Sequence, residues 1–191
     1  KLITVGIGSV VNSLTNTQPI IMTILIAVIF SILIVSPISA IGIGIAIGIS
    51  GLAAGSAAVG VSASAIMLAL GAWRVNKVGV PISVLLGAVK LMMPNTIRHP
   101  IIFLPVTCTA AVSGLVGVLL NIKGTPDSAG FGLIGLVGPI KSLNLLGTSM
   151  GSGLLLIAIT YVIVPIISAI FFNYLFVKIL KLYKPDVFIF K

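Results

Sequence analysis

The stretch from Ile38 to Trp73 reads ISAIGIGIAIGISGLAAGSAAVGVSASAIMLALGAW and contains no charged residue. As one straight helix it would be about 50 Å long, whereas about 20 residues cross the hydrocarbon core of a membrane. We therefore expect it to break, tilt or fold back. Small residues at four-residue spacing let helix backbones approach closely in a membrane. They are Gly44 and Gly48, Gly51 and Gly55, and Ser56, Gly60 and Ser64. The stretch predicts the packed centre of a polytopic membrane protein.

Part of this stretch has a strand-like alternative. From Ile41 to Ile49 large and small residues alternate strictly, which is the period of a β-strand. No turn-bounded partner strands follow, and an isolated strand could not satisfy its backbone in lipid. We favour a helix, with a non-helical break near Ser50 and Gly51.

The composition is typical of a membrane protein. Of the 191 residues, 59% are hydrophobic and 7% are charged, which is far from the usual soluble range. The formal charge of +9 comes from 11 Lys and Arg against two acidic residues, Asp127 and Asp186. Because the basic residues are scattered between apolar segments without interleaved aromatics, we predict no nucleic-acid partner. We expect them to flank the membrane, beside its lipids, on the cytoplasmic side.

The sequence offers little material for catalysis or for metal binding. It contains one His, one Cys and no Glu, so we expect no catalytic residue, no metal site and no cofactor. Cys108 is the single cysteine, which excludes an internal disulfide. It lies within an apolar run and is expected to be a buried thiol rather than a reactive nucleophile.

The remaining apolar runs predict an all-α protein with about four to six transmembrane helices and one or two re-entrant segments. Besides the central stretch, the predicted crossings are Ile20–Val35, Ile101–Leu120 and Leu154–Val177. Two shorter runs, Val78–Met93 and Phe131–Ile140, are interrupted by Pro, Lys or Gly. We predict that the first is re-entrant or interfacial and that the second is re-entrant. Residues 1–17 are more polar and are expected to form an interfacial helix or the tail of a preceding helix.

The basic residues predict an orientation. Lys178, Lys181 and Lys184 close the last crossing and favour a cytoplasmic C-terminus. Counting four crossings back from there places the loop around Thr125 outside, and Lys1 and residues 74–99 inside. If residues 38–73 cross twice, the N-terminus moves outside.

Two groups of polar side chains are candidates for binding a small polar solute such as a sugar. Short apolar pieces interrupted by Gly or Pro often expose backbone groups toward a transporter's binding site. The candidates beside the two short runs are Asn95, Arg98 and His99, and Lys141, Asn144, Thr148 and Ser149. The alternative is that Asn95 caps a helix and that Arg98 and His99 face lipid headgroups. Lys141 could equally snorkel to water.

Three motifs occur in order along the chain. They are SGLAAGSAAVG at residues 50–60, MPNTIRHPIIFLP at 93–105 and GFGLIGLVGPI at 130–140. Together they resemble the type 2 family of phosphotransferase-system enzyme II C components, which includes membrane proteins described as regulators of toxin production. The resemblance covers roughly residue 36 to the final helix.

The resemblance implies a homodimeric sugar permease of the bacterial plasma membrane, which presents its substrate inside for phosphorylation by a partner B component. The phosphoryl-carrying Cys or His would belong to that partner, so the chain is at most the membrane component of a transport-coupled phosphotransferase. Related sugar permeases often use a Glu near a His at the sugar, and this chain has no Glu.

Two other functions remain as alternatives. One is a non-transporting membrane regulator or sensor related to the toxin regulators, and the other is a channel or exporter. We expect one permease-like domain over residues 1–191. Because the chain begins at Lys1 rather than Met, it could also be a fragment of a longer protein.

Overall fold

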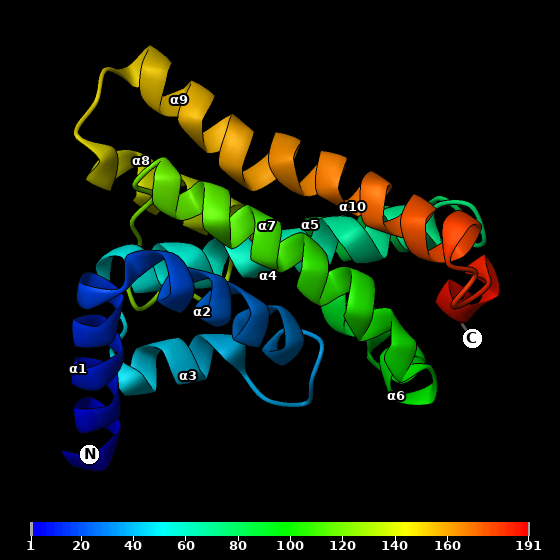
Figure 1. Ribbon diagram of the computed structural model, residues 1–191, viewed down its shortest axis with the longest axis horizontal. Helices are drawn as coiled ribbons and strands as arrows, with labels where there is room; N and C mark the ends of the chain where they lie inside the picture. The colour runs from blue at the N-terminus through cyan, green and yellow to red at the C-terminus, as the bar shows by residue number, and fades with distance from the viewer. Residues whose placement is uncertain (1, 191) are drawn as a thin grey trace.

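The computed structural model describes residues 2–190, and the chain is helical through most of that range (Figure 1). Residues 41–49, with their strand-like alternation, lie in a helix and the turn after it rather than in a strand. The α-helices are α1 (Leu2–Thr17), α2 (Pro19–Leu33), α3 (Ala40–Ile47), α4 (Gly51–Ala72), α5 (Gly79–Leu86), α6 (Met93–Arg98), α7 (Phe103–Leu119), α8 (Val137–Leu146), α9 (Met150–Ala158) and α10 (Val164–Tyr174).

Within the described residues, three helices are long and apolar enough to cross a membrane. They are Gly51–Ala72, Pro100–Leu119 and Met150–Ile179, and Pro19–Leu33 is a shorter apolar helix. The last of the three runs through α9 and α10 without a break, although it contains Pro165. A π-helical turn at Ile159–Ile163 directly precedes this proline, and such turns accommodate the hydrogen bond that a proline removes.

Helix α4 is the centre of the bundle, as its small residues predict. It is almost entirely buried and packs against α2, α7 and α10. A Cβ atom on Gly60 would collide with the backbone of Ala27 in α2, so the two helices touch at a residue without a side chain. The Ser64 hydroxyl donates a hydrogen bond to the Ser31 carbonyl of α2 at 2.9 Å. Hydroxyl groups are thus satisfied inside the bundle.

The predicted break near Ser50 and Gly51 is confirmed. Gly48 caps the C-terminus of α3, and Gly51 is the first residue of α4. Their φ values are both positive, at 65° and 58° respectively. Glycine adopts this left-handed conformation without the steric cost of a Cβ. The central stretch is therefore two antiparallel helices rather than one, and α3 has only eight residues.

This double passage decides where α1 lies in the bundle. The Asn12 side chain of α1 donates to the Gly48 carbonyl at 3.2 Å and accepts from the Ser50 amide at 3.0 Å. Gly51 in turn pairs with Gly124 in the loop 121–130. Helix α1 and that loop therefore lie at the same end of the bundle, which we name the loop end. Helix α1 thus lies at the opposite end of the bundle from the residues that follow α4. This placement agrees with the alternative in which residues 38–73 pass twice, although α3, at about 12 Å, is too short to cross a membrane by itself. The side of the membrane on which each end lies stays a prediction.

The opposite end carries most of the positive charge, and we name it the basic end. Here α4 and α10 end, α6 lies close to the C-terminal turn, and Lys90 donates to the carbonyl groups of Ser36 and Ile38 at 2.8 and 2.9 Å (Figure 1). Its basic residues are Arg74, Lys77, Lys90, Arg98, Lys178, Lys181 and Lys184. The loop end has Lys123 and Lys141 with Asp127.

Candidate functional site

The first short segment, residues 78–93, enters the bundle from the basic end and returns to it. After α4 the chain turns at residues 73–78, runs inward as α5 and reverses at Gly87, whose φ is 147°. It then returns through a 3₁₀ turn, Val89–Met92, to α6. This course fits the predicted re-entrant segment, and glycine allows the reversal because few other residues adopt such a φ.

The second short segment, residues 131–140, enters the bundle from the loop end. Gly124 lies beside Gly51 at the start of α4, and Gly132 packs against Ala58 and Ser62, about two and three turns further along. The residues that follow line a cavity together with Ile66. The segment thus follows α4 over about 22 Å before α8 returns the chain to the loop end. It enters and leaves the bundle at the same end, a course that fits the predicted re-entrant segment.

The two segments meet beside the second half of α4. A Cβ on Gly87 would lie 3.2 Å from the Ile134 side chain, so the tip of one segment touches the tip of the other. A cavity of about 490 Å³ opens at this contact, and its lining is almost wholly apolar, with Trp73 as its one aromatic residue. It is lined by residues of α4, of α5, of the turn 133–136 and of the last helix, including Ile66, Leu85, Leu86, Leu133, Gly135, Leu136 and Ile166.

The tip of the second segment has a strained backbone. Gly132, Gly135 and Leu136 all have positive φ values, of 55°, 59° and 58°. For Leu136 this left-handed conformation costs about 1–2 kcal/mol, because its Cβ crowds the following carbonyl. Strain of this kind is often found where a backbone is shaped for function. The polar candidates from the sequence do not include this tip, although its repeated glycines mark the place.

Asn95 holds the C-terminal turn in place. It is buried, and its side-chain amide donates to the carbonyl groups of Val187 and Ile189 at 2.9 and 2.7 Å. On the other side of the same turn, Asn76 donates to the Phe188 carbonyl and accepts from the Phe190 amide, both at 2.7 Å. These four bonds fasten residues 187–190 to the basic end. The sequence predicts that Asn95 binds a polar solute or caps a helix, and nothing in it pairs Asn95 with Asn76.

Arg98 and His99 lie close to Asn95 but remain exposed. With it they line a cavity of about 300 Å³, which Asp186, Val187 and Ile189 complete. This first predicted group is therefore brought together, at the surface of the basic end. Nearby, burial raises the pKa of Tyr183 above its usual range, and its hydroxyl donates to Asn173 at 3.3 Å.

The second predicted group lies at the loop end. Lys141 projects from α8 and forms an ion pair with Asp127 at 3.3 Å, with about half of each side chain exposed. The Thr125 side chain, the local backbone and Lys141, in that order, lower the pKa of the Asp127 carboxyl. The pair therefore persists at neutral pH and is lost only as the pH falls through that lowered pKa. Asn144, Thr148 and Ser149 are exposed, and Ser149 hydrogen-bonds Ser152 at 2.8 Å.

The structure does not bring the two predicted groups together within one chain. Figure 1 places α6, with the first group, and α8, with the second, at opposite ends of the molecule. What joins the two short segments is the aliphatic contact between their tips. The polar side chains therefore flank that contact from its two ends rather than converging on it.

A buried hydroxyl pair supports α8 from inside. Ser142 and Tyr161 are both fully buried, and their hydroxyl oxygens lie 2.8 Å apart. The tyrosine comes from the π-helical turn, so the pair joins the returning segment to the last helix. This pair could not be predicted from the sequence, because a serine and a tyrosine within apolar runs carry no pattern that shows they are in contact.

We expect Ser142→Ala to lower the free energy of unfolding by about 1–3 kcal/mol, since it leaves the Tyr161 hydroxyl buried without a partner. The double variant Ser142→Ala/Tyr161→Phe removes both polar groups and should recover part of the loss. Thermal unfolding in detergent measures both. If the double variant is as unstable as the sum of the single variants, the two side chains do not form a buried pair.

We expect Asn95→Asp to release the C-terminal turn. A carboxylate cannot donate to the two carbonyl groups, so amide exchange at Phe190 should accelerate about tenfold or more. The matched control is Asn144→Asp, which makes the same change at an exposed position. Hydrogen exchange followed by mass spectrometry compares the two. Equal exchange in both variants would show that Asn95 does not hold the turn.

Comparison with known proteins adds one finding. The model of the family described as phosphotransferase system, EIIC matches residues 1–190 of the chain. Neither a curated protein nor a solved structure matches it. The family match covers all three motifs and both short segments. The chain therefore belongs to the phosphotransferase-system EIIC family and is a membrane permease component of that system.

Proposed function

We propose that this permease component translocates a small polar solute, a sugar, and presents it for phosphorylation by a cytoplasmic B component. The proposal rests on one observation. The two short segments, one from the basic end and one from the loop end, meet beside α4. Broken segments that meet inside a bundle are typical of transporters, because their irregular backbone can bind a solute while either end opens.

The solute would pass the contact between Gly87 and Ile134 and use the exposed backbone at residues 135 and 136. The two predicted polar groups then take successive roles on the same path. Lys141, Asn144, Thr148 and Ser149 would meet the solute at the loop end. Arg98 and His99 would meet it at the basic end, with Asn95 shaping the wall of their cavity.

The basic end is proposed to face the cytoplasm. Its excess of Lys and Arg over the loop end supports this orientation, since positively charged loops remain on the cytoplasmic side. The partner's phosphoryl group would then approach a positively charged surface. The same orientation puts α1 and the C-terminal residues on opposite sides of a bacterial plasma membrane.

The phosphoryl-carrying residue is proposed to belong to the partner. Cys108 is a half-buried free thiol within α7, away from both tips. The homodimer implied by the family is part of this proposal, and the mass of the purified protein in detergent tests it. The chain by itself would then bind and move the solute without forming a covalent intermediate.

Two glycines provide a matched test of the proposed path. Gly135 at the tip and Gly147 after α8 have φ values of 59° and 63°, and neither has a neighbour that an added Cβ would crowd. Alanine therefore costs a similar amount of backbone strain at both, about 1 kcal/mol. Only Gly135 lies at the contact between the segments.

Uptake of labelled sugars by proteoliposomes, with the B component inside, is the experiment. A thermal-shift screen first identifies the sugar, because a ligand of the folded state raises its unfolding temperature. We expect Gly135→Ala to reduce uptake about tenfold and Gly147→Ala to leave it nearly unchanged. Equal uptake in both would contradict the path, and stabilisation by a protein partner without uptake of any sugar would favour a regulator.

A further inference from the structure

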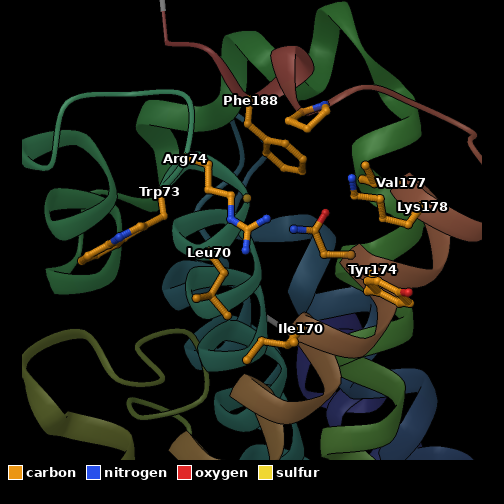
Figure 2. A pocket seen from close by; sticks show the side chains of 11 residues that line it. Leu70, Trp73, Arg74, Ile170, Tyr174, Val177, Lys178 and Phe188 are labelled. Carbon is orange, nitrogen blue, oxygen red and sulfur yellow. The ribbon is translucent and has the colours of Figure 1, made fainter.

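A second cavity lies at the basic end, between the ends of α4 and α10. Its volume is about 530 Å³. It shares Leu70 and Trp73 with the cavity at the contact between the two short segments, and its other lining residues are different. Figure 2 shows Arg74 extending from the end of α4 into this cavity, Lys178 on the opposite wall and Phe188 covering one side. The cavity is half open, so a ligand could enter from the side of the bundle.

The charge at this cavity is not compensated by the protein. Among residues 2–190 the one ion pair is Lys141–Asp127, so neither Arg74 nor Lys178 has an acidic partner. The chain has no acidic residues besides Asp127 and Asp186, and neither lines the cavity. Two cations that face one space without a carboxylate favour an anion between them.

Apart from Asn173, whose side chain accepts from the Tyr183 hydroxyl, most of the remaining lining is apolar. Leu70 and Ile170 form the walls on the side of the membrane interior, and more than half of the Ile170 side chain is exposed. Trp73 and Tyr174 flank the cavity and are 49% and 60% exposed. Such half-exposed aromatics mark the level of the lipid headgroups. The cavity is therefore charged at its rim and apolar below it.

We propose that this cavity binds an anionic phospholipid. The phosphate would lie between the Arg74 guanidinium and the Lys178 ammonium, and the first part of an acyl chain would pack on Leu70 and Ile170. A free phosphate would engage the cations but leave the apolar walls exposed. A zwitterionic lipid would bring its own cation into a site that already has two. The combination of charges and walls thus selects a lipid with net negative charge.

Trp73 gives a direct readout, because it is the single tryptophan of the chain. The protein is reconstituted in phosphatidylcholine vesicles that contain a small fraction of brominated lipid, either phosphatidylglycerol or phosphatidylcholine. Bromine quenches tryptophan fluorescence only at contact. Each basic residue near a membrane surface raises the relative affinity for an anionic lipid about fivefold, so the two should together enrich it about 25-fold. Brominated phosphatidylglycerol should therefore quench Trp73 much more strongly at the same mole fraction.

The variants separate a site from a diffuse basic surface. Arg74→Gln/Lys178→Gln should abolish the excess quenching by phosphatidylglycerol. Lys77→Gln/Lys184→Gln removes the same charge at the same end, from residues that do not line the cavity, and should keep the excess. Equal quenching by the two brominated lipids, or loss of the excess in both double variants, would overturn the proposal. Relief of the quenching by inorganic phosphate or a sugar phosphate would instead identify a soluble ligand and also overturn it.

Discussion

The substitution Gly60→Ala is expected to lower the free energy of unfolding by about 3 kcal/mol, although it adds only one methyl group. The new Cβ would overlap the carbonyl group and Cα of Ala27. Backbone atoms cannot rotate away as a side chain can, so α2 and α4 must separate. In a protein of this size the loss corresponds to a fall in unfolding temperature of about 6–12 °C.

Gly117→Ala is the matched control, since it places the same residue in the interior of a neighbouring helix. There the nearest atoms, on Thr160 and Val59, lie 3.7 Å from the added Cβ, which is ordinary packing distance. Alanine also favours a helix over glycine by up to about 1 kcal/mol. We expect Gly117→Ala to be neutral or stabilising. Equal unfolding temperatures for the two variants would contradict the close approach of α2 and α4.

The second large effect is expected for Phe188→Ala, at about 3–5 kcal/mol. Only 1% of Phe188 is exposed, and its ring fills the space above Gly71, where a Cβ would lie 2.6 Å from the ring. Tyr183 packs against the ring edge to face, with ring centroids 5.8 Å apart. Removing the ring leaves a cavity between the C-terminal turn and α4 and weakens the attachment that Asn76 and Asn95 provide.

Phe190→Ala removes the same side chain two residues later, where 40% of the residue is exposed. We expect it to cost less than about 1 kcal/mol. Thermal unfolding and hydrogen exchange of residues 187–190 distinguish a general loss of stability from local release of the turn. If both phenylalanine variants behave alike, the buried position of Phe188 is not what holds the turn.

Much of the fold could be predicted from the sequence because its determinants are local. Apolar runs predicted the helices, and four-residue spacing of small residues predicted that α4 is central. Ser50 and Gly51 marked the break. The passage of α3 was not counted as a separate crossing, since an eight-residue helix is too short to be recognised by hydropathy. Its return moved α1 to the loop end.

The candidate site was less predictable because it depends on contacts between distant residues. Asn95 looked available for a solute, yet it bonds carbonyl groups more than 90 positions later in the chain. Lys141 also looked available for a solute, yet it forms an ion pair with Asp127 in the preceding loop. The tip-to-tip contact is made by Gly87 and Ile134, and neither residue type carries a chemical signature. Sequence patterns predict where a helix is interrupted. The residues that the interrupted segment contacts depend on tertiary packing.

The most direct test of this account is whether the two broken segments meet. Cys108 is first replaced by Ala, and a cysteine pair is introduced as Leu86→Cys and Leu136→Cys, at two exposed positions that line the same cavity. The control pair is Lys77→Cys and Lys123→Cys, at opposite ends of α4, which is about 33 Å long. With a short bifunctional maleimide, the account predicts an intramolecular crosslink between residues 86 and 136 that also reduces sugar uptake, and none in the control pair. Absence of the first crosslink, or equally fast crosslinking of the control pair, would contradict it.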